Sequence, residues 1–220
     1  MSESQNFPHE CDMQKALANL DYFTEWGGRG WKNLCRHAIH HLGNLQGKTV
    51  LEIGPRFGKM STLFALLGAQ VVGVETNANA LPIAKNEVRR WNVHERVSFF
   101  YYNGDLDSCP AIGKMEFDII FTKSVLVLLG NQFTEFLGKL DGRLKPGGQC
   151  VFLENRYGGT FFSLLRMVRP ASRSHFKKVD YLTPLHLKRI GQVFPILEIK
   201  KTFFPPIYLI IAKKSATVNS

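Results

Sequence analysis

VLEIGPRFGKMS, at residues 50–61, decides which fold this sequence can adopt. An apolar run leads into a glycine-containing turn, and the turn leads into a segment whose apolar residues recur at helical spacing. A strand, a tight turn and a helix in this order are typical of the nucleotide-binding corner of an α/β sheet. Glu52, Gly54 and Gly58 fit such a turn, but Arg56 stands where a middle glycine is usual. The stretch therefore predicts a ligand-binding turn with an altered centre.

Segments of strand type and helix type alternate along the chain. Five apolar runs are predicted to be strands, at residues 49–53, 70–75, 97–102, 117–122 and 149–154. Helices are predicted between them, at residues 59–68, 78–91 and 133–140. Strands that are apolar almost throughout are buried on both sides, so they are typical of a parallel sheet with helices on both faces.

The C-terminal end departs from this alternation. The strands predicted at 194–201 and 206–214 have little between them except Pro205 and Pro206. Strands so close in sequence must pair antiparallel, because a parallel return requires a long crossover. The sequence therefore predicts an α/β protein with a Rossmann-like, doubly wound, seven-stranded sheet. This sheet is mostly parallel, with a C-terminal antiparallel strand and helices on both faces.

Length and composition indicate one globular domain with a small N-terminal addition. The 220 residues are 45% apolar and 21% charged, which is ordinary for a protein with a packed core. We expect residues 1–44 to form two helices around the glycine-rich elbow at 21–31, as a flap or cap over the binding site of a main domain at 45–220. The N-terminus lacks a signal-peptide pattern, the cysteines are scattered, and the apolar runs are too short to span a bilayer. These features predict a cytoplasmic protein, either a monomer or a homodimer.

The positive charge is concentrated in one segment. The chain has a net charge of +10, and residues 156–189 carry eight lysines and arginines against Asp180 alone, which leaves +7. We expect this segment to be a substrate-side insertion at about 156–192. It suits a small anionic molecule, the phosphates of RNA, or the surface of anionic lipid. The small molecule is favoured because the chain has no separate nucleic-acid module, while RNA and peripheral membrane contact stay as alternatives.

Polar residues and glycines follow each predicted parallel strand. In a doubly wound sheet, ligands bind at the carboxyl ends of the strands, so these residues should meet. Glu75 stands about 20 residues beyond the first glycine, where a carboxylate commonly binds a ribose diol. A Walker loop needs different spacing before its lysine, and a dinucleotide fold needs the middle glycine. The pattern therefore favours a nucleoside that is not a polyphosphate.

The chain resembles the class I S-adenosylmethionine-dependent methyltransferases over about residues 45–212. The motifs that carry the resemblance are VLEIGPRFGKMS at 50–61, VVGVETN at 71–77, NGDL at 103–106, FDIIFTKSVL at 117–126 and LKPGGQCVFLEN at 144–155. The resemblance implies S-adenosylmethionine as the cofactor and S-adenosylhomocysteine as the product. It does not identify the methyl acceptor.

The resemblance also implies which residues form the site. Gly54 to Gly58 would lie under the methionine part of the cofactor, Glu75 would bind the ribose hydroxyls, and Asp105 with Leu106 would bracket the adenine. The full set of expected cofactor residues is Glu52, Gly54, Arg56, Phe57, Gly58, Glu75, Thr76, Asn77, Gly104, Asp105, Leu106, Lys123 and Ser124. The expected substrate residues are Tyr22, Trp26, Trp31, Arg156, Tyr157 and His175. The Arg56 side chain could turn to solvent or bind the methionine carboxylate of the cofactor, where its forked donors would fit.

Methyl transfer from a sulfonium requires alignment more than acid–base chemistry, although a base helps when the acceptor is a hydroxyl. The candidate catalytic residues are His175, Lys123 and Glu154. No metal is expected, because Lys123 stands where the metal-dependent relatives carry a carboxylate. We therefore predict in-line methyl transfer to a small anionic acceptor that carries a carboxylate, a hydroxyl or a glycan or natural-product group. An RNA methyltransferase that uses the segment 156–192, or a protein that binds S-adenosylmethionine without catalysis, remains as the alternative.

Overall fold

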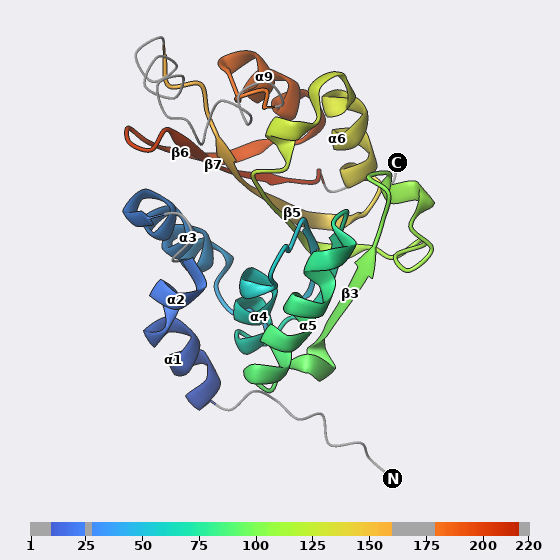
Figure 1. Cartoon of the computed structure of the whole chain (residues 1–220). Helices are drawn as coiled ribbons and strands as arrows, with labels where there is room; N and C mark the ends of the chain where they lie inside the picture. Colours follow the sequence, from blue (N-terminus) through green and yellow to red (C-terminus); the bar gives the residue numbers. More distant parts are fainter. Residues whose placement is uncertain (1–9, 25–27, 160–178, 216–220) are drawn as a thin grey trace.

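The computed structural model describes residues 10–24, 28–159 and 179–215, and these form one seven-stranded sheet with helices packed against it (Figure 1). The strands are β1 Thr49–Ile53, β2 Gln70–Glu75, β3 Val97–Tyr101, β4 Phe117–Lys123, β5 Leu144–Asn155, β6 Ile196–Thr202 and β7 Ile207–Lys213. The helices are α1 Glu10–Ala18, α2 Leu20–Thr24, α3 Gly28–Leu42, α4 Lys59–Leu66, α5 Leu81–Arg90, α6 Phe133–Asp141 and α9 Pro184–Val193.

The strand order is β3-β2-β1-β4-β5-β7-β6. Strands β1 to β5 are parallel to their neighbours, whereas β7 is antiparallel to both β5 and β6. This confirms the predicted fold class, including the C-terminal antiparallel strand. The chain crosses from one side of β1 to the other between β3 and β4. The carboxyl ends of β1 and β4 flank this crossing, which is where doubly wound sheets bind ligands, and we call this edge of the sheet the opening.

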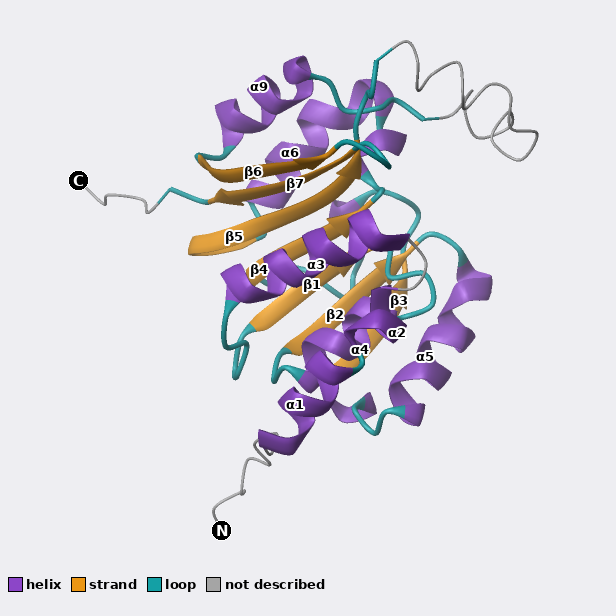
Figure 2. Ribbon diagram, turned by 90° about the vertical axis from the view of Figure 1, so that its left-hand side faces the viewer, coloured by secondary structure: helices purple, strands orange, loops and turns teal. Residues whose placement is uncertain are grey.

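The helices form one layer on each face of the sheet (Figure 2). One face is covered by α3, α4 and α5, with α1 and α2 packed against them, and its core includes Phe23, Phe64 and Leu209. The other face is covered by α6 and α9, and its core includes Phe133, Phe152 and Ile210. Neighbouring residues of a strand enter opposite cores, as in the pair Leu209 and Ile210, because side chains alternate across a sheet. The continuous apolar strands thus reflect burial on both faces.

The N-terminal region differs from the prediction of two helices around a glycine break. Its described residues form three helices, with α2 ending at Thr24 and α3 beginning at Gly28, so Gly28 and Gly30 lie in the first turn of α3 and not between two helices. Packing explains the glycine at position 30. A Cβ atom there would lie 3.1 Å from Cδ of Pro205, which is tighter than an ordinary contact, so glycine lets α3 approach the turn between β6 and β7 this closely without displacing Pro205.

Residues 145–148, whose sequence Lys-Pro-Gly-Gly is typical of a turn, lie inside β5, which begins earlier than the strand predicted at 149–154. The pairing of β5 with β4 jumps from Leu144 to Gln149, so the intervening residues form an irregularity in the strand. Gly147 has a φ of 75°, a left-handed conformation that glycine adopts readily. These turn-forming residues therefore bend a strand instead of preceding one. Within the described ranges, no helix has the length and apolar composition needed to cross a membrane.

Candidate active site

The turn after β1 has an unusual backbone conformation. Gly54 and Gly58 have φ values of 74° and 77°, and Arg56 between them has a φ of 51°. A Cβ atom on Gly58 would lie 3.0 Å from the Cα atom of Ala84, so the turn has no room for a side chain there. Arg56 adopts the same left-handed region although it is not a glycine, which costs conformational energy. Arg56 thus has the backbone conformation that a glycine would have at the centre of this turn.

Glu75, the last residue of β2, holds this conformation in place. One oxygen of its carboxylate accepts a hydrogen bond from the backbone N–H of Arg56 at 2.8 Å, and the other accepts from the backbone N–H of Asn77 at 2.9 Å. The residue is 7% exposed. Each carboxylate oxygen can accept a second hydrogen bond, so Glu75 can bind a pair of hydroxyls while it fixes the two loops. The side chain of Arg56 is exposed, with its guanidinium carbon 4.9 Å from the centre of the Phe57 ring.

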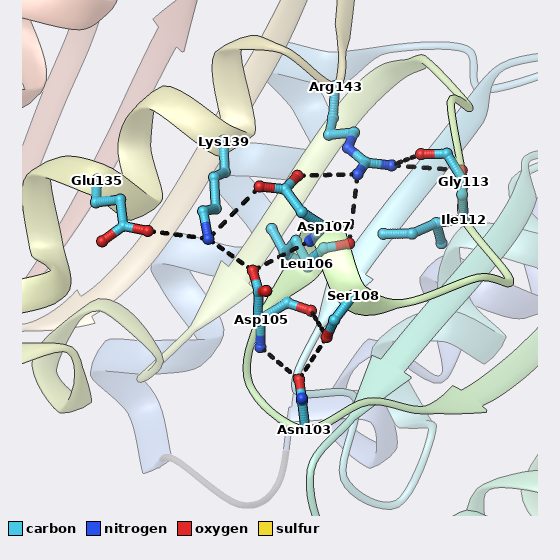
Figure 3. A network of polar contacts seen from close by, with 10 residues as sticks. All are labelled: Asn103, Asp105, Leu106, Asp107, Ser108, Ile112, Gly113, Glu135, Lys139 and Arg143. Carbon is cyan, nitrogen blue, oxygen red and sulfur yellow. Dashed lines mark hydrogen bonds and ion pairs between the residues drawn. The ribbon is translucent and has the colours of Figure 1, made fainter.

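The loop after β3 carries a network of polar contacts around Asp105 (Figure 3). The side-chain oxygen of Asn103 accepts from the Asp105 N–H at 3.0 Å and from the Ser108 hydroxyl at 2.7 Å. Oδ1 of Asp105 accepts from Lys139 at 2.6 Å, and this hydrogen bond lowers the pKa of the Asp105 carboxyl. Among the described residues Oδ2 has no hydrogen-bond partner, so Asp105 can accept a hydrogen bond from a ligand. Leu106, next to it, is fully buried.

Lys139 and Arg143 are the members of this network that the sequence did not reveal. Lys139 contacts the carboxylates of Asp105, Asp107 and Glu135, and Arg143 bonds to Asp107 at 3.1 Å. Lys139 comes from α6, whose apolar face was read correctly, but nothing in a helical pattern shows which loop its polar face will meet. The pairing depends on the topology, so the sequence carried no signal for it.

Lys123 ends β4 next to the turn after β1. Its amine lies 5.7 Å from the centre of the Trp31 ring, and Trp31 itself is 8% exposed on α3. Burial lowers the pKa of Lys123 to about 7, and the charge of Arg56 contributes to the same shift. The side chain therefore places an amine that changes its protonation near neutral pH beside the opening, between an aromatic ring and the altered turn.

Two glutamates lie buried beneath the opening. Glu52 accepts a hydrogen bond from the Ser61 hydroxyl, and burial raises its pKa to about 7. Glu154 is fully buried, and one of its oxygens accepts from the Thr122 hydroxyl at 2.9 Å and from the Val125 N–H at 3.0 Å. Burial raises the pKa of Glu154 to about 7 as well. Glu154 therefore positions the loop after β4, and this enclosure does not favour its role as a base, which stays a prediction.

The structure distributes the predicted substrate residues over different places. Trp31 reaches the opening beside Lys123, and Tyr157 is 46% exposed at the end of β5. Tyr22 instead packs on the outer helices, where its hydroxyl bonds to the Glu87 carboxylate at 2.9 Å. Arg156 donates to the carbonyl of Thr202 at 2.9 Å. Trp26 and His175 lie outside the described residues.

Within residues 10–24, 28–159 and 179–215, no group of three or more His, Cys, Asp or Glu side chains could hold a metal ion. Two of the histidines of α3 have other partners. His37 lies 2.9 Å from the Glu198 carboxylate, and His41 lies 3.2 Å from the side-chain oxygen of Gln149. The expectation that no metal takes part stays a prediction.

Comparisons with known proteins agree with this geometry. A family described as a methyltransferase domain matches residues 51–152. The chain is similar to the demethylmenaquinone methyltransferase of Tropheryma whipplei strain Twist, with 33% identity over 140 residues, which are 61% of this chain and 55% of that protein. The chain thus spans about half the length of the Tropheryma whipplei relatives that it matches. It is also similar to a ubiquinone biosynthesis O-methyltransferase of Aromatoleum aromaticum, with 24% identity over 195 residues and 81% of each chain covered.

A solved structure extends the likeness over nearly the whole chain. The magnesium protoporphyrin IX methyltransferase of Synechocystis PCC 6803, solved with bound S-adenosylhomocysteine, has a TM-score of 0.64 and 16% identity. The match covers 97% of this chain and 90% of that one, and at this identity it shows the fold. The strand order, the glycine turn fixed by Glu75 and the matched domain lead to one assignment. Residues 51–152 form a methyltransferase domain, and the chain has the fold of the class I S-adenosylmethionine-dependent methyltransferases.

Proposed function

We propose that this protein binds S-adenosylmethionine and transfers its methyl group to a small molecule, leaving S-adenosylhomocysteine. The main observation behind the proposal is that the Glu75 carboxylate accepts hydrogen bonds from the backbone N–H groups of both Arg56 and Asn77. The same carboxylate can accept further hydrogen bonds, and it lies beside a turn that has no room for a side chain at Gly58. This arrangement fits a ribose whose two hydroxyls donate to Glu75 while the ligand lies close to the backbone of the turn. The residues present therefore suit the cofactor.

Each part of the opening has a separate task in this proposal. The turn from Gly54 to Gly58 supports the amino-acid part of the cofactor, Glu75 accepts from the ribose hydroxyls, and Asp105 accepts from the adenine amine. The bound cofactor supplies a methyl group on a positively charged sulfur, which a nucleophile displaces in line. The chain has to align the acceptor and exclude water, and the buried ring of Trp31 beside Lys123 serves the second purpose.

We propose a small, anionic acceptor. Lys123 and Arg56 put two basic side chains at the opening, and the amine of Lys123 can hold an acceptor carboxylate or phenolate when protonated. In its neutral form, the same amine can accept the proton of an acceptor hydroxyl. The relatives named above act on quinone precursors, which supports a small molecule as the acceptor. Lys123 is therefore the leading candidate for the catalytic or positioning group among the described residues.

Calorimetry with S-adenosylmethionine, S-adenosylhomocysteine and NAD tests the binding step directly. We expect both methionine-derived ligands to bind and NAD to show no heat, because the turn lacks the middle glycine that pyrophosphate needs. A transfer assay with methyl-labelled cofactor and fractionated cell extract then tests the reaction. Label in a small-molecule fraction supports the proposal, and label in RNA would favour the nucleic-acid alternative. Binding without transfer to any fraction would assign the chain as a non-catalytic binder.

A further inference from the structure

The turn between β6 and β7, residues 203–206, exposes two consecutive phenylalanines and is called the aromatic turn below. Phe203 is 77% exposed and Phe204 is 65% exposed, and these are the highest values of any large apolar residue in the described ranges. Turns are usually made of glycine and small polar residues. Exposed apolar groups of this size mark sites of interaction with proteins or membranes.

The aromatic turn is built as a fixed projection. Two nitrogens of the Arg156 side chain donate to the Thr202 carbonyl, at 2.9 and 3.3 Å, and the Arg156 N–H donates to the Pro206 carbonyl at 3.0 Å. The Thr202 hydroxyl donates to the carbonyl of Pro205, and Gly30 of α3 packs against Pro205. Contacts from β5 and α3 thus hold the turn that presents the two rings.

Basic groups surround the aromatic turn. Lys201 precedes it on β6, Arg156 lies against it, and Arg29 is the exposed neighbour of Gly30, while the charge of Lys200 is balanced by Glu198. The acidic residue of β6, Glu198, is already paired with His37 at 2.9 Å and with Lys200 at 3.4 Å. Aromatic rings flanked by lysine and arginine suit the interface of an anionic bilayer, where the rings enter the headgroup layer and the cations meet lipid phosphates.

The position of the aromatic turn connects it to the active site. Because β7 is antiparallel to β5 and pairs Ile207 with Asn155, the turn projects from the edge at which the parallel strands end. That is the edge that carries Glu75 and Lys123. A surface held by this turn would therefore face the opening.

We propose that the aromatic turn docks the protein on the surface of an anionic lipid bilayer, with the opening of the active site turned toward the lipid. Two exposed rings flanked by basic residues on a turn favour an anionic bilayer over a protein partner, because a bilayer admits an apolar group of any shape, whereas a protein must offer a matching pocket. The proposal is independent of methyl transfer, since docking requires only the turn and its charges.

Vesicle flotation tests the docking. We expect the wild-type protein to float with vesicles of phosphatidylcholine and phosphatidylglycerol, and only weakly with vesicles of phosphatidylcholine alone. The double variant F203S/F204S should lose at least about tenfold in affinity, because it removes the apolar surface that would insert. The affinity of the variant R29Q/K201Q for the mixed vesicles should fall by about fivefold for each charge removed, and this loss should become smaller as the salt concentration rises.

A matched control removes exposed apolar side chains elsewhere. The variant L17S/M115S changes residues that are 42% and 43% exposed on α1 and in the loop before β4, and it should bind vesicles like the wild type. Circular dichroism and calorimetry with S-adenosylhomocysteine show whether each variant is folded. Phe203→Trp adds a direct readout, because its emission should shift to shorter wavelength on the mixed vesicles.

Three results would overturn the proposal. The first is wild-type protein that does not float with the mixed vesicles. The second is equal flotation of F203S/F204S and wild type. The third is a wild-type dimer that becomes a monomer in F203S/F204S, which would assign the turn to contact between two copies of the chain.

Discussion

The two halves of the sheet achieve a fixed shape in different ways, and we call the half with β3, β2 and β1 the β1–β2 end and the half with β7 and β6 the β6–β7 end. At the β1–β2 end, the turn after β1 is held by Glu75 and Ala84, which are within 30 residues of it in sequence. At the β6–β7 end, the aromatic turn is held by Arg156 and Gly30, and Gly30 is separated from Pro205 by most of the chain. The first end is thus organised by local contacts and the second by contacts that only the folded topology creates. The predictions below test this difference, from the largest expected effect to the smallest.

Replacing Glu75 should have the largest effect. In Glu75→Ala, the N–H groups of Arg56 and Asn77 lose their acceptor, which costs about 2–4 kcal/mol when two partly buried donors are left without one. We expect S-adenosylhomocysteine affinity to fall by about a hundredfold or more, because the ribose contact and the turn are lost together. Calorimetry measures this loss. Glu116→Ala, at an exposed position before β4, should bind normally, and normal binding by Glu75→Ala would refute the assigned role.

Enlarging Gly30 tests the long-range end. Gly30→Val should lower the free energy of unfolding by about 1–3 kcal/mol, because its side chain would overlap Pro205. Chemical denaturation measures the change. The matched control is Gly138→Ala in α6, where an added Cβ meets no atom within 4 Å, so a gain of up to about 1 kcal/mol is expected. Equal behaviour of the two variants would show that α3 does not depend on close packing at the aromatic turn.

Lys123 makes stability depend on pH in a direction that can be predicted. The folded pKa is lowered to about 7 from 10.5, so the unfolded chain binds more protons between these values and stability rises with pH across this window. Lys123→Met removes this dependence. The variant should gain about 1–2 kcal/mol near pH 7, after an allowance for solvent screening, and little near pH 10. Unfolding measured across that range checks the sign, and a gain that grows with pH would contradict it.

Arg56→Gly should have the smallest effect on stability, and it tests whether the guanidinium binds the cofactor. Glycine relieves the φ of 51°, so a gain of up to about 1 kcal/mol is expected. Asn92→Gly, at a φ of 57°, is the control and should gain less, because asparagine tolerates this region better. If the guanidinium binds the methionine carboxylate, affinity for S-adenosylhomocysteine falls about tenfold. Unchanged affinity would show that the Arg56 side chain does not contact the cofactor and lies in solvent against the Phe57 ring.

The contrast between the two ends also explains what could be predicted from sequence. The strands and the motif residues Gly54, Gly58 and Glu75 are tied to local patterns, so spacing was enough to locate them along the chain, whereas the strand order came only from the structure. The role of Glu154 as the partner of the Val125 N–H could not be foreseen, because a residue after a strand can face the opening or the interior. The contact of Gly30 with Pro205 was missed for a similar reason, since a glycine near a helix end is more often a breaker than a point of close packing.

The charged residues of β6 have a further consequence for how the protein behaves at high concentration. β6 is the last strand of the sheet, so one side of its backbone could in principle pair with a strand of another molecule. Glu198, Lys200 and Lys201 lie along it, and lysines on a terminal strand oppose such pairing because a stacked copy would bring like charges together. The charges on β6 thus oppose the addition of further strands to the sheet. This holds even though the turn that follows β6 exposes two phenylalanines.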